Sequence, residues 1–465
     1  MLCWNVGLYQ RPFLGMLVFI SLAVLGCVRG DNQLLRGFKD YNIVLISVDT
    51  LRADYLGCYG APNKTPFIDS IAQTGFLFES MYTTSSTTLP AHVSLLTSLY
   101  PKDCRNGYSL GDSVSTMAEV LGAHGYLNWA FVSALPLDVR FNLDQGFDYY
   151  DADFSECSGS LDLDEKKWFA HNYKVFDCNA EETTNRVLTT LQTKEHHTPY
   201  FLWVHYYDPH LPYTPPKDFY DSTKVTRDRF PYFLAKPTQS DITSLQELYR
   251  GEVTYVDYHL KRLIEGLKKL GKAEKTILVI VADHGENLYQ HDGYLDHSLV
   301  VYDTVMWIPC IVQLPGHSGR RITELVSIMD IMPTLLDLVS VSHDATEGRS
   351  LIALMDGEKS KPVRDYVTCE TNDYGVRAKD QTIAVRTKTM KFIHNSWKRG
   401  KNMFFALTKD PYEKHPLGKV QDPEADKLTG WYEEWRKDYK SGNMSSPGEL
   451  DSETREALKS LGYLK

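Results

Sequence analysis

The sequence predicts an α/β protein: a large, mostly parallel mixed sheet with helices on both faces, plus a small C-terminal α+β subdomain. Three apolar runs, at residues 42–48, 200–206 and 276–281, are typical of strands buried on both faces of a parallel sheet. Helical periodicity between these runs indicates crossover connections. Beyond about residue 338 the segments become short, more polar and interrupted by proline and glycine, which indicates a second, smaller unit.

The remaining elements follow along the chain. The longest expected helix spans residues 240–270, because Tyr255, Leu260, Leu263 and Leu267 form an apolar stripe and Gly271 provides a stop. Ser452 or Asp451 would cap a final helix. The other expected elements are helices at 65–73, 115–123 and 451–461, and strands at 128–133, 307–314, 382–386 and 391–394.

Length and charge limit the organisation and the partners of the chain. Its 465 residues, 43% of them hydrophobic, are enough for a large core. We expect a signal or anchor at 1–30, a catalytic domain at 31–340 and a C-terminal subdomain at 341–465. A formal net charge of -10 argues against a nucleic-acid partner. No feature of the sequence fixes an oligomeric state.

The N-terminus has the pattern of an export signal. Arg11 precedes an apolar run at 13–26, which is too short for a membrane span. Leu-Gly-Cys at 25–27 resembles a bacterial lipoprotein cleavage site, so either Cys27 is lipidated and anchors the protein to a membrane or a simple signal is removed. We therefore expect a secreted, periplasmic or cell-surface protein. An even number of cysteines remains, which permits disulfides in such a compartment: Cys58, Cys104, Cys157, Cys178, Cys310 and Cys369.

Residues 83–98, TTSSTTLPAHVSLLTS, combine a hydroxyl-rich run with the start of a helix. Pro90 suits the first turn of a helix, so Thr88 would lie just ahead of it. A helix N-terminus binds anions, and His92 adds an imidazole nearby. The stretch taken alone is also compatible with a simple loop that caps a helix.

Potential ligands follow each of the three buried strands. Asp49 and Thr50 follow the first, Asp208 and His210 the second, and Asp283 and His284 the third. The binding crevice of an α/β sheet lies beyond the carboxyl ends of its strands, so these residues would converge there. Two carboxylates and one imidazole suit a divalent metal, and Thr88 could complete the site as a nucleophile.

Each residue also has a purely structural interpretation. Asp49 could cap a helix, residues 283–286 could form an acidic turn, and His205 could be a core histidine. His291 and His297 could lie in exposed loops. The shared position of the carboxylates at one end of successive strands favours the functional interpretation.

Five segments give the chain a resemblance to the sulfatase family of the alkaline phosphatase superfamily, over roughly residues 40–465. They are NIVLISVDTLRADYLGCYG (42–60), TTLPAHVSLLTS (87–98), HYYDPHLPYTPP (205–216), VIVADHGENLYQHDG (279–293) and HSLVVYDTVMWIPCIV (297–312). The tail SLGYL (460–464) is also usual in bacterial members. The resemblance implies metal ligands at Asp49, Asp283 and His284, a nucleophile at Thr88, and catalytic contacts at His92, His210 and His297.

The departures from the family concern the chemistry. Sulfatases carry Cys or Ser at position 88, which is oxidised to formylglycine, and threonine cannot give that aldehyde. The second adjacent Asp of the family is Thr50, the usual Arg is His92, and His297 lies near the usual lysine. Threonine nucleophiles in this superfamily occur in phosphodiesterases and phosphoethanolamine transferases, which commonly hold two zinc ions. A second metal would draw on spare side chains: His205, Asp208, His210, His291 and His297.

The resulting expectation is an exported hydrolase of anionic sulfate or phosphate-type esters, small molecules or glycans, that uses Thr88 and one divalent ion (Ca, Mg, Mn or Zn). Two alternatives stay open: a transferase that passes the group from Thr88 to an acceptor other than water, and a non-catalytic relative that binds a glycan.

Overall fold

The computed structural model describes residues 35, 37–106, 109–158, 177–194, 199–226, 237–358, 362–371, 382–395, 401–418, 420–441 and 452. The expected signal or anchor at 1–30, with Cys27, lies outside these residues, and so does the expected helix at 451–461 apart from Ser452. In the part of the chain that is described, no helix is long and apolar enough to cross a membrane.

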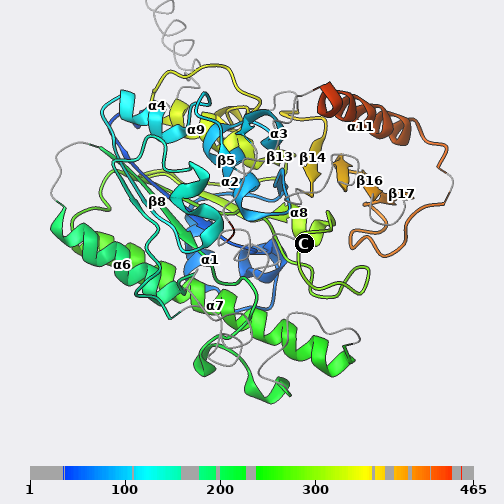
Figure 1. The fold of residues 1–465 in the computed structure, drawn as a ribbon, viewed down its shortest axis with the longest axis horizontal. Coiled ribbons are helices and arrows are strands. Elements are labelled where there is room, and N and C mark those ends of the chain that lie inside the picture. Colours follow the sequence, from blue (N-terminus) through cyan, green and yellow to red (C-terminus); the bar gives the residue numbers. More distant parts are fainter. Residues whose placement is uncertain are drawn as a thin grey trace, which may run out of the picture.

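An eight-stranded mixed sheet forms the centre of the molecule (Figure 1). Its strands, in spatial order, are β12 (Arg321–Ile322), β2 (Phe76–Phe78), β11 (Cys310–Gln313), β9 (Thr276–Ala282), β1 (Asn42–Val48), β8 (Tyr200–Tyr206), β6 (Leu127–Phe131) and β7 (Tyr149–Asp151). The pairs from β9 through β1, β8 and β6 to β7 are all parallel, whereas β11 runs antiparallel to both of its neighbours. The predicted fold class is therefore confirmed.

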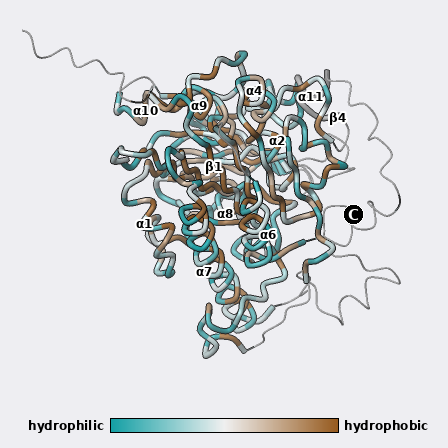
Figure 2. The backbone as a smooth tube through the Cα atoms, turned by 90° about the vertical axis from the view of Figure 1, so that its left-hand side faces the viewer, coloured by the Kyte–Doolittle hydropathy of each residue, from teal (hydrophilic) through white to brown (hydrophobic). Residues whose placement is uncertain are grey.

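The three predicted central strands form as expected because each is apolar on both faces. All of β8, and β1 and β9 after their first residue, are buried. The hydropathy colouring shows β1 as a hydrophobic strand in the interior (Figure 2). In the register, Ser47 of β1 pairs with His205 of β8, and Val48 pairs with Ala282 of β9. The residues that follow these strands therefore meet at one edge of the sheet.

Helices cover both faces of the sheet (Figure 1). One layer contains α1 (Pro66–Thr74), α6 (Ala180–Thr193) and α7 (Gln239–Lys269), and the other contains α2 (Thr88–Thr97), α4 (Met117–Ala123) and α9 (Ile331–Leu338). The predicted helices at 65–73, 115–123 and 240–270 correspond to α1, α4 and α7. The sequence did not predict α6, because its buried face includes Thr183 and Thr184, so its apolar periodicity is weak.

A four-stranded antiparallel sheet makes up the C-terminal subdomain, as expected. Its strands are β14 (Val367–Glu370), β15 (Ile383–Arg386), β16 (Met390–Asn395) and β17 (Lys401–Ala406), and α11 (Pro423–Ser441) packs against β15 and β16. The segment 307–314 was predicted as one strand, which is wrong. Pro309 divides it into β10 (Trp307–Ile308), in a separate three-stranded sheet, and β11, because proline cannot donate to a strand ladder.

The C-terminal subdomain is hydrogen-bonded directly to the segment that leads to Thr88. Ser85 forms a parallel bridge with Glu370, the last residue of β14. The Ser86 N–H donates to Glu370 O at 3.1 Å, and the Glu370 N–H donates to Thr84 O at 3.0 Å. The backbone ahead of Thr88 thus forms a short continuation of the small sheet.

A buried ion network forms a second junction between the subdomain and the rest of the chain. Lys391 of β16 is fully buried, and its Nζ lies 2.9 Å from Asp303 Oδ1 and 2.7 Å from Glu413 Oε1. Arg386 of β15 contacts Asp303 at 3.2 Å, and the Asp303 N–H donates to Glu413 Oε2 at 2.6 Å. Asp303 begins α8 (Asp303–Met306), which follows the loop that carries His297.

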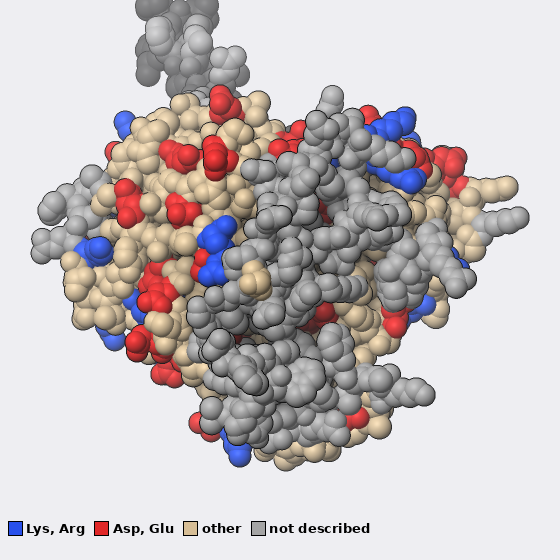
Figure 3. All heavy atoms as spheres, viewed as in Figure 1, with Lys and Arg blue, Asp and Glu red and all other residues tan. Residues whose placement is uncertain are grey.

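The surface charges are intermixed. Figure 3 shows Lys and Arg side chains scattered among Asp and Glu over the described part of one face, without a continuous basic patch there. Asn63 begins an Asn-Lys-Thr glycosylation sequon at 63–65; it is 9% exposed and its side-chain amide donates to Tyr55 O at 3.0 Å, so that amide is occupied within the fold.

Candidate active site

The turn after β1 holds Asp49 and Thr50 in a constrained backbone. Thr50 has a φ of 52°, which is unusual for a β-branched residue. Tyr249 of α7 stabilises this turn, because its hydroxyl donates to Thr50 O at 2.7 Å and accepts from the Arg52 N–H at 3.0 Å. The Thr50 N–H donates to Asp283 Oδ1 at 3.2 Å. The turn therefore sets the position of Asp49 relative to the turn that follows β9.

The turn after β9 presents Asp283 and His284. Asp283 Oδ1 accepts from the N–H groups of Thr50 and His284, whereas Asp283 Oδ2 has no hydrogen-bond partner among the residues that the structure describes. His284 Nδ1 lies 3.0 Å from Gly285 O, so it carries the proton and donates it to that carbonyl. The lone pair on His284 Nε2 then faces the two carboxylates, 3.7 Å from Asp49 Oδ1 and 3.5 Å from Asp283 Oδ2.

Thr88 is the first residue of α2, with Thr87 at the N-cap position. Pro90 lies in the first turn, as predicted, although the helix begins at Thr88 itself and not just after it. The Thr88 hydroxyl donates to Asp49 Oδ2 at 3.1 Å and lies 3.4 Å from His284 Nε2. The hydroxyl thus lies at the positive end of a helix dipole and beside the carboxylate cluster.

Asp49, Asp283 and His284 fit a divalent cation. One ligand atom from each lies within 4.8 Å of the other two, and all three residues are fully buried. Ligands of a tetrahedral ion at about 2.1 Å stand roughly 3.4 Å apart, which is close to the separations found here. Burial raises the pKa of both Asp49 and Asp283, and in the described part of the chain Asp49 Oδ1 and Asp283 Oδ2 lack hydrogen-bond partners. Two adjacent buried carboxylates of this kind require a compensating positive charge.

His92 supports the Thr88 backbone. The Trp203 Nε1–H donates to Ser47 Oγ at 2.9 Å, which leaves the Ser47 hydroxyl to donate to His92 Nε2, also at 2.9 Å. His92 Nδ1 then carries the proton and donates it to Thr88 O at 2.8 Å. Burial lowers the pKa of His92 to about 3. His92 is therefore a neutral positioning residue, and this geometry differs from the substrate contact expected at His92.

His210 and His297 lie together on the far side of His284. The ring centroids of His284 and His297 are 4.3 Å apart, and those of His210 and His297 are 5.3 Å apart. His297 Nδ1 lies 3.3 Å from both Glu286 Oε1 and Asp296 Oδ1. Burial opposes a charge on His297, but the two carboxylates outweigh it and raise its pKa to about 9. Burial lowers the pKa of His210 to about 4.

Among the spare side chains, Asp208 and His291 point elsewhere. The Asp208 carboxyl accepts from the Ala180 N–H at the start of α6, and burial raises its pKa to about 7. His291 stacks on Tyr302, with ring centroids 3.9 Å apart. His205 lies next to the cluster, with its Nε2 3.5 Å from Asp49 Oδ2.

Four contributors to the site were not predicted as such: Ser47, Trp203, Glu286 and Asp296. Ser47 is the one polar residue within the apolar part of its strand, which is a detectable signal. Glu286 was noted only as part of an acidic turn. The structure brings Asp49, Thr88, Asp283 and His284 together, as the sequence led us to expect.

Fold and site together define a hydrolase of sulfuric or phosphoric esters. Residues 41–341 match the Sulfatase family, and residues 290–434 match the family described as N-sulphoglucosamine sulphohydrolase, C-terminal. The chain therefore belongs to the sulfatase family.

Individual relatives agree with this assignment. The chain is 28% identical to an arylsulfatase of Clostridium perfringens, over 80% of this chain and 89% of the relative. It is 29% identical to an ulvan-active sulfatase of Formosa agariphila, over 88% of this chain and 82% of the relative. The solved structure of a phosphonate monoester hydrolase of Agrobacterium radiobacter has a similar fold, with a TM-score of 0.68 at 21% identity, and the match covers 86% of this chain and 95% of that one.

Proposed function

We propose that this protein is an exported, metal-dependent hydrolase that cleaves anionic esters with Thr88 as its nucleophile and prefers phosphate-type esters to sulfates. The observation that carries this proposal is the position of Thr88 Oγ1, 3.1 Å from Asp49 Oδ2 and 3.4 Å from His284 Nε2. A buried threonine needs activation to act as a nucleophile, and these neighbours belong to the candidate cation site.

Asp49, Asp283 and His284 would hold the cation, with Thr88 beside it. A bound divalent ion supplies the positive charge that lowers the pKa of a neighbouring hydroxyl and polarises an ester oxygen. The expected ions are Ca²⁺, Mg²⁺, Mn²⁺ and Zn²⁺. The imidazole among the ligands favours Zn²⁺ or Mn²⁺, because Ca²⁺ prefers oxygen ligands alone.

The reaction then divides into two displacements. Thr88 Oγ gives its proton to Asp49 Oδ2, which already accepts its hydrogen bond, and forms a bond to the phosphorus or sulfur atom, while the bond from that atom to the ester oxygen breaks. His297, whose pKa is raised to about 9, would neutralise the departing alkoxide or give it a proton, and His210, beside His297, would contact the same group as a neutral imidazole. A water molecule then attacks the phosphorus or sulfur atom and gives a proton to His297, the bond from that atom to Thr88 Oγ breaks, and Thr88 Oγ takes back its proton from Asp49.

The preference for phosphate-type esters rests on the side chain at position 88. Threonine cannot become formylglycine, so the esterified residue has no adjacent hydroxyl that could expel sulfate. The relatives include sulfatases by name, and the similar fold of a phosphonate monoester hydrolase supports including phosphorus esters among the candidate substrates.

A disulfide supports the proposal that the protein is exported. Cys157 and Cys178 are bonded, and such bonds persist in oxidising compartments. Cys58, Cys310 and Cys369 are free, and the latter two are buried. Removal of residues 1 to about 26–30, or lipidation of Cys27, can be read directly from the intact mass of the native protein.

The test uses purified protein with an aryl sulfate, a phosphate monoester, a phosphodiester and a phosphonate ester, each with and without added Zn²⁺, Mn²⁺, Mg²⁺ or Ca²⁺. We expect Thr88→Ala to abolish turnover with metal content unchanged, and Thr88→Ser to keep part of the activity. Thr97→Ala is the matched control, because it removes a buried hydroxyl from the same helix, one that donates to Val93 O and accepts from the Leu99 N–H. Mass spectrometry of the quenched enzyme should find the transferred group on Thr88.

Two results would contradict the proposal. Undiminished turnover in Thr88→Ala would exclude the nucleophile. Multiple turnovers on a sulfate ester with none on phosphorus esters would refute the preference.

A further inference from the structure

His205 is the last residue but one of β8, near the carboxyl end of the strand, and is fully buried. Its Nε2 has no hydrogen-bond partner among the described residues, and it lies 3.5 Å from Asp49 Oδ2. Ligand atoms of His205, His92 and Asp283 also lie within 4.8 Å of one another. A buried ring nitrogen without a partner is costly, so its position against two carboxylates requires an explanation.

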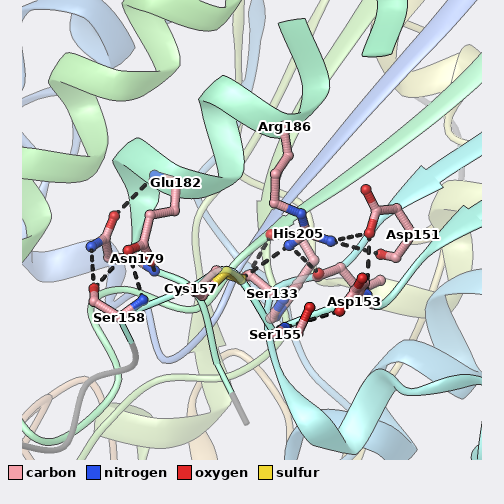
Figure 4. The surroundings of a disulfide bond; sticks show 12 residues. Ser133, Asp151, Asp153, Ser155, Cys157, Ser158, Asn179, Glu182, Arg186 and His205 are labelled. Atoms are coloured by element: carbon pink, nitrogen blue, oxygen red, sulfur yellow. Dashed lines mark hydrogen bonds and ion pairs between the residues drawn. A yellow bond between two sulfur atoms is a disulfide. The ribbon is translucent and has the colours of Figure 1, made fainter. Parts of the chain in front are cut away.

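Ser133 determines which nitrogen of His205 carries the proton. The Ser133 hydroxyl donates its only proton to His205 O, at 2.6 Å. Its oxygen also lies 3.1 Å from His205 Nδ1 and can only accept there, so Nδ1 carries the proton. Nε2 therefore presents a lone pair to Asp49. Figure 4 shows Ser133 between the disulfide and the His205 ring.

A hydrogen bond from His205 to Asp49 does not account for this arrangement. With the proton on Nδ1, Nε2 has nothing to donate, and two lone pairs 3.5 Å apart repel each other. The same separation, 3.5 Å, is found between His284 Nε2 and Asp283 Oδ2, where the imidazole also directs a lone pair at a carboxylate. A cation between these groups resolves both contacts.

Ser133 is itself held firmly. The Cys178 N–H donates to Ser133 O at 3.0 Å, and Cys178 is bonded to Cys157. Arg186 of α6 donates to Val132 O and to Cys178 Sγ, at 3.3 Å and 3.1 Å, and it also pairs with Asp151. The disulfide, Ser133 and His205 thus form a connected support (Figure 4), and His205 Nε2 at its end lies 3.5 Å from Asp49 Oδ2.

We propose that His205 Nε2 is a further ligand of the cation held by Asp49, Asp283 and His284, and that Ser133 is the positioning residue that sets its tautomer. The inference rests on the cation of the proposed function and is independent of Thr88 as nucleophile. With two imidazoles in the ligand set, the site favours Zn²⁺ over Ca²⁺ more strongly than one imidazole would. Ligand histidines are usually oriented by such a hydrogen bond to the other ring nitrogen.

The test measures metal binding directly. The full-length protein is stripped with a chelator and titrated with Zn²⁺ against a competing chelator, as wild type, His205→Ala and Ser133→Ala. We expect His205→Ala to weaken Zn²⁺ binding by about 100-fold or more, and Ser133→Ala by about 10-fold. His259→Ala is the matched control, because it removes a buried imidazole of α7 that contacts Arg262 and Tyr255, and it should bind Zn²⁺ as the wild type does.

Cobalt provides a second measurement. The visible absorption of Co²⁺ depends on the number and type of its ligands, so His205→Ala should change the spectrum of the Co²⁺-loaded protein and His259→Ala should not. If His205→Ala does not fold, the Ser133→Ala titration and spectrum decide. Unchanged Zn²⁺ affinity and an unchanged Co²⁺ spectrum in a folded His205→Ala or Ser133→Ala protein would overturn the inference, while leaving the proposed function intact if Thr88→Ala is inactive. A wild-type protein that binds no Zn²⁺ would overturn both the inference and the zinc assignment.

Discussion

Replacing Lys391 by methionine tests the ion network that joins the small sheet to α8. The Lys391 ammonium contacts Asp303 at 2.9 Å and Glu413 at 2.7 Å, and it is fully buried. In Lys391→Met, Asp303 still pairs with Arg386. Glu413 loses the ammonium group that it contacts, and its side chain is only 1% exposed. Leaving one buried charge without its partner costs about 3–5 kcal/mol of unfolding free energy.

The loss of unfolding free energy in Lys391→Met should depend on pH, and the pKa of Glu413 determines whether the loss grows or shrinks as pH rises. Burial raises the pKa of Glu413 to about 7, although Lys391 opposes the shift. Since the folded pKa lies above the unfolded value, stability from this group is present at low pH and is lost as pH rises through about 7. Without Lys391 the pKa of Glu413 rises further, so the variant avoids most of the cost by protonation at pH 6 and loses more unfolding free energy at pH 8.5.

The assay is urea denaturation of wild type, Lys391→Met, Glu413→Gln and the double variant at pH 6 and pH 8.5. We expect the double variant to recover most of the loss at pH 8.5, because glutamine removes the stranded charge. A loss below about 1 kcal/mol at both pH values, or a double variant no more stable than Lys391→Met, would refute the reasoning.

Three further predictions concern a cap, a close contact and the cation. Asp257 accepts from the Phe67 and Ile68 N–H groups, and burial raises its pKa to about 6, so stability from this group falls as pH rises from about 4 to 6. Asp257→Asn should remove that fall. The difference in unfolding free energy between the variant and the wild type, measured from denaturation curves, should therefore change by up to about 3 kcal/mol between pH 4 and pH 7. A Cβ at Gly285 would lie 2.2 Å from Thr304 O, so Gly285→Ala should displace His284 and lower both turnover and Zn²⁺ affinity at least about tenfold, and an unchanged affinity would contradict the contact. Chelation should lower the melting temperature, with a free-energy loss of about 2.7 kcal/mol for a metal present at 100 times its Kd, whereas an equal melting temperature with and without chelator would argue against a bound ion.

The parts of the fold that the sequence predicted are those in which local pattern and tertiary burial agree. The strands at 42–48 and 200–206 are apolar throughout or nearly so, and they form at the expected residues. The helix α6 was not predicted, because threonines fill part of its buried face. The strand at 307–314 was predicted without a break, because its hydrophobicity is continuous although Pro309 removes a ladder donor.

The candidate site, like the fold, could be predicted from the sequence only in part. The convergence of Asp49 and Asp283 follows from the polarity of parallel strands, which can be read from the chain. The functions of His92 and His205 depend on which ring nitrogen carries a proton, and that depends on Ser47 and Ser133, which lie 45 and 72 residues away in sequence. No pattern in a single sequence encodes such a pairing.

The bridge between Ser85 and Glu370 has a consequence for protein engineering. A fragment ending near residue 340 would leave the Ser86 N–H and the Thr84 carbonyl, both of which bond Glu370 in the whole chain, without those partners. Exchanging the C-terminal subdomain between relatives would therefore replace part of the backbone that holds Thr88, along with whatever else the graft was intended to change. Chimaeras joined within β14, after the residue that pairs with Ser85 has been matched, should retain the geometry around Thr88 better than those joined at the expected boundary near residue 340.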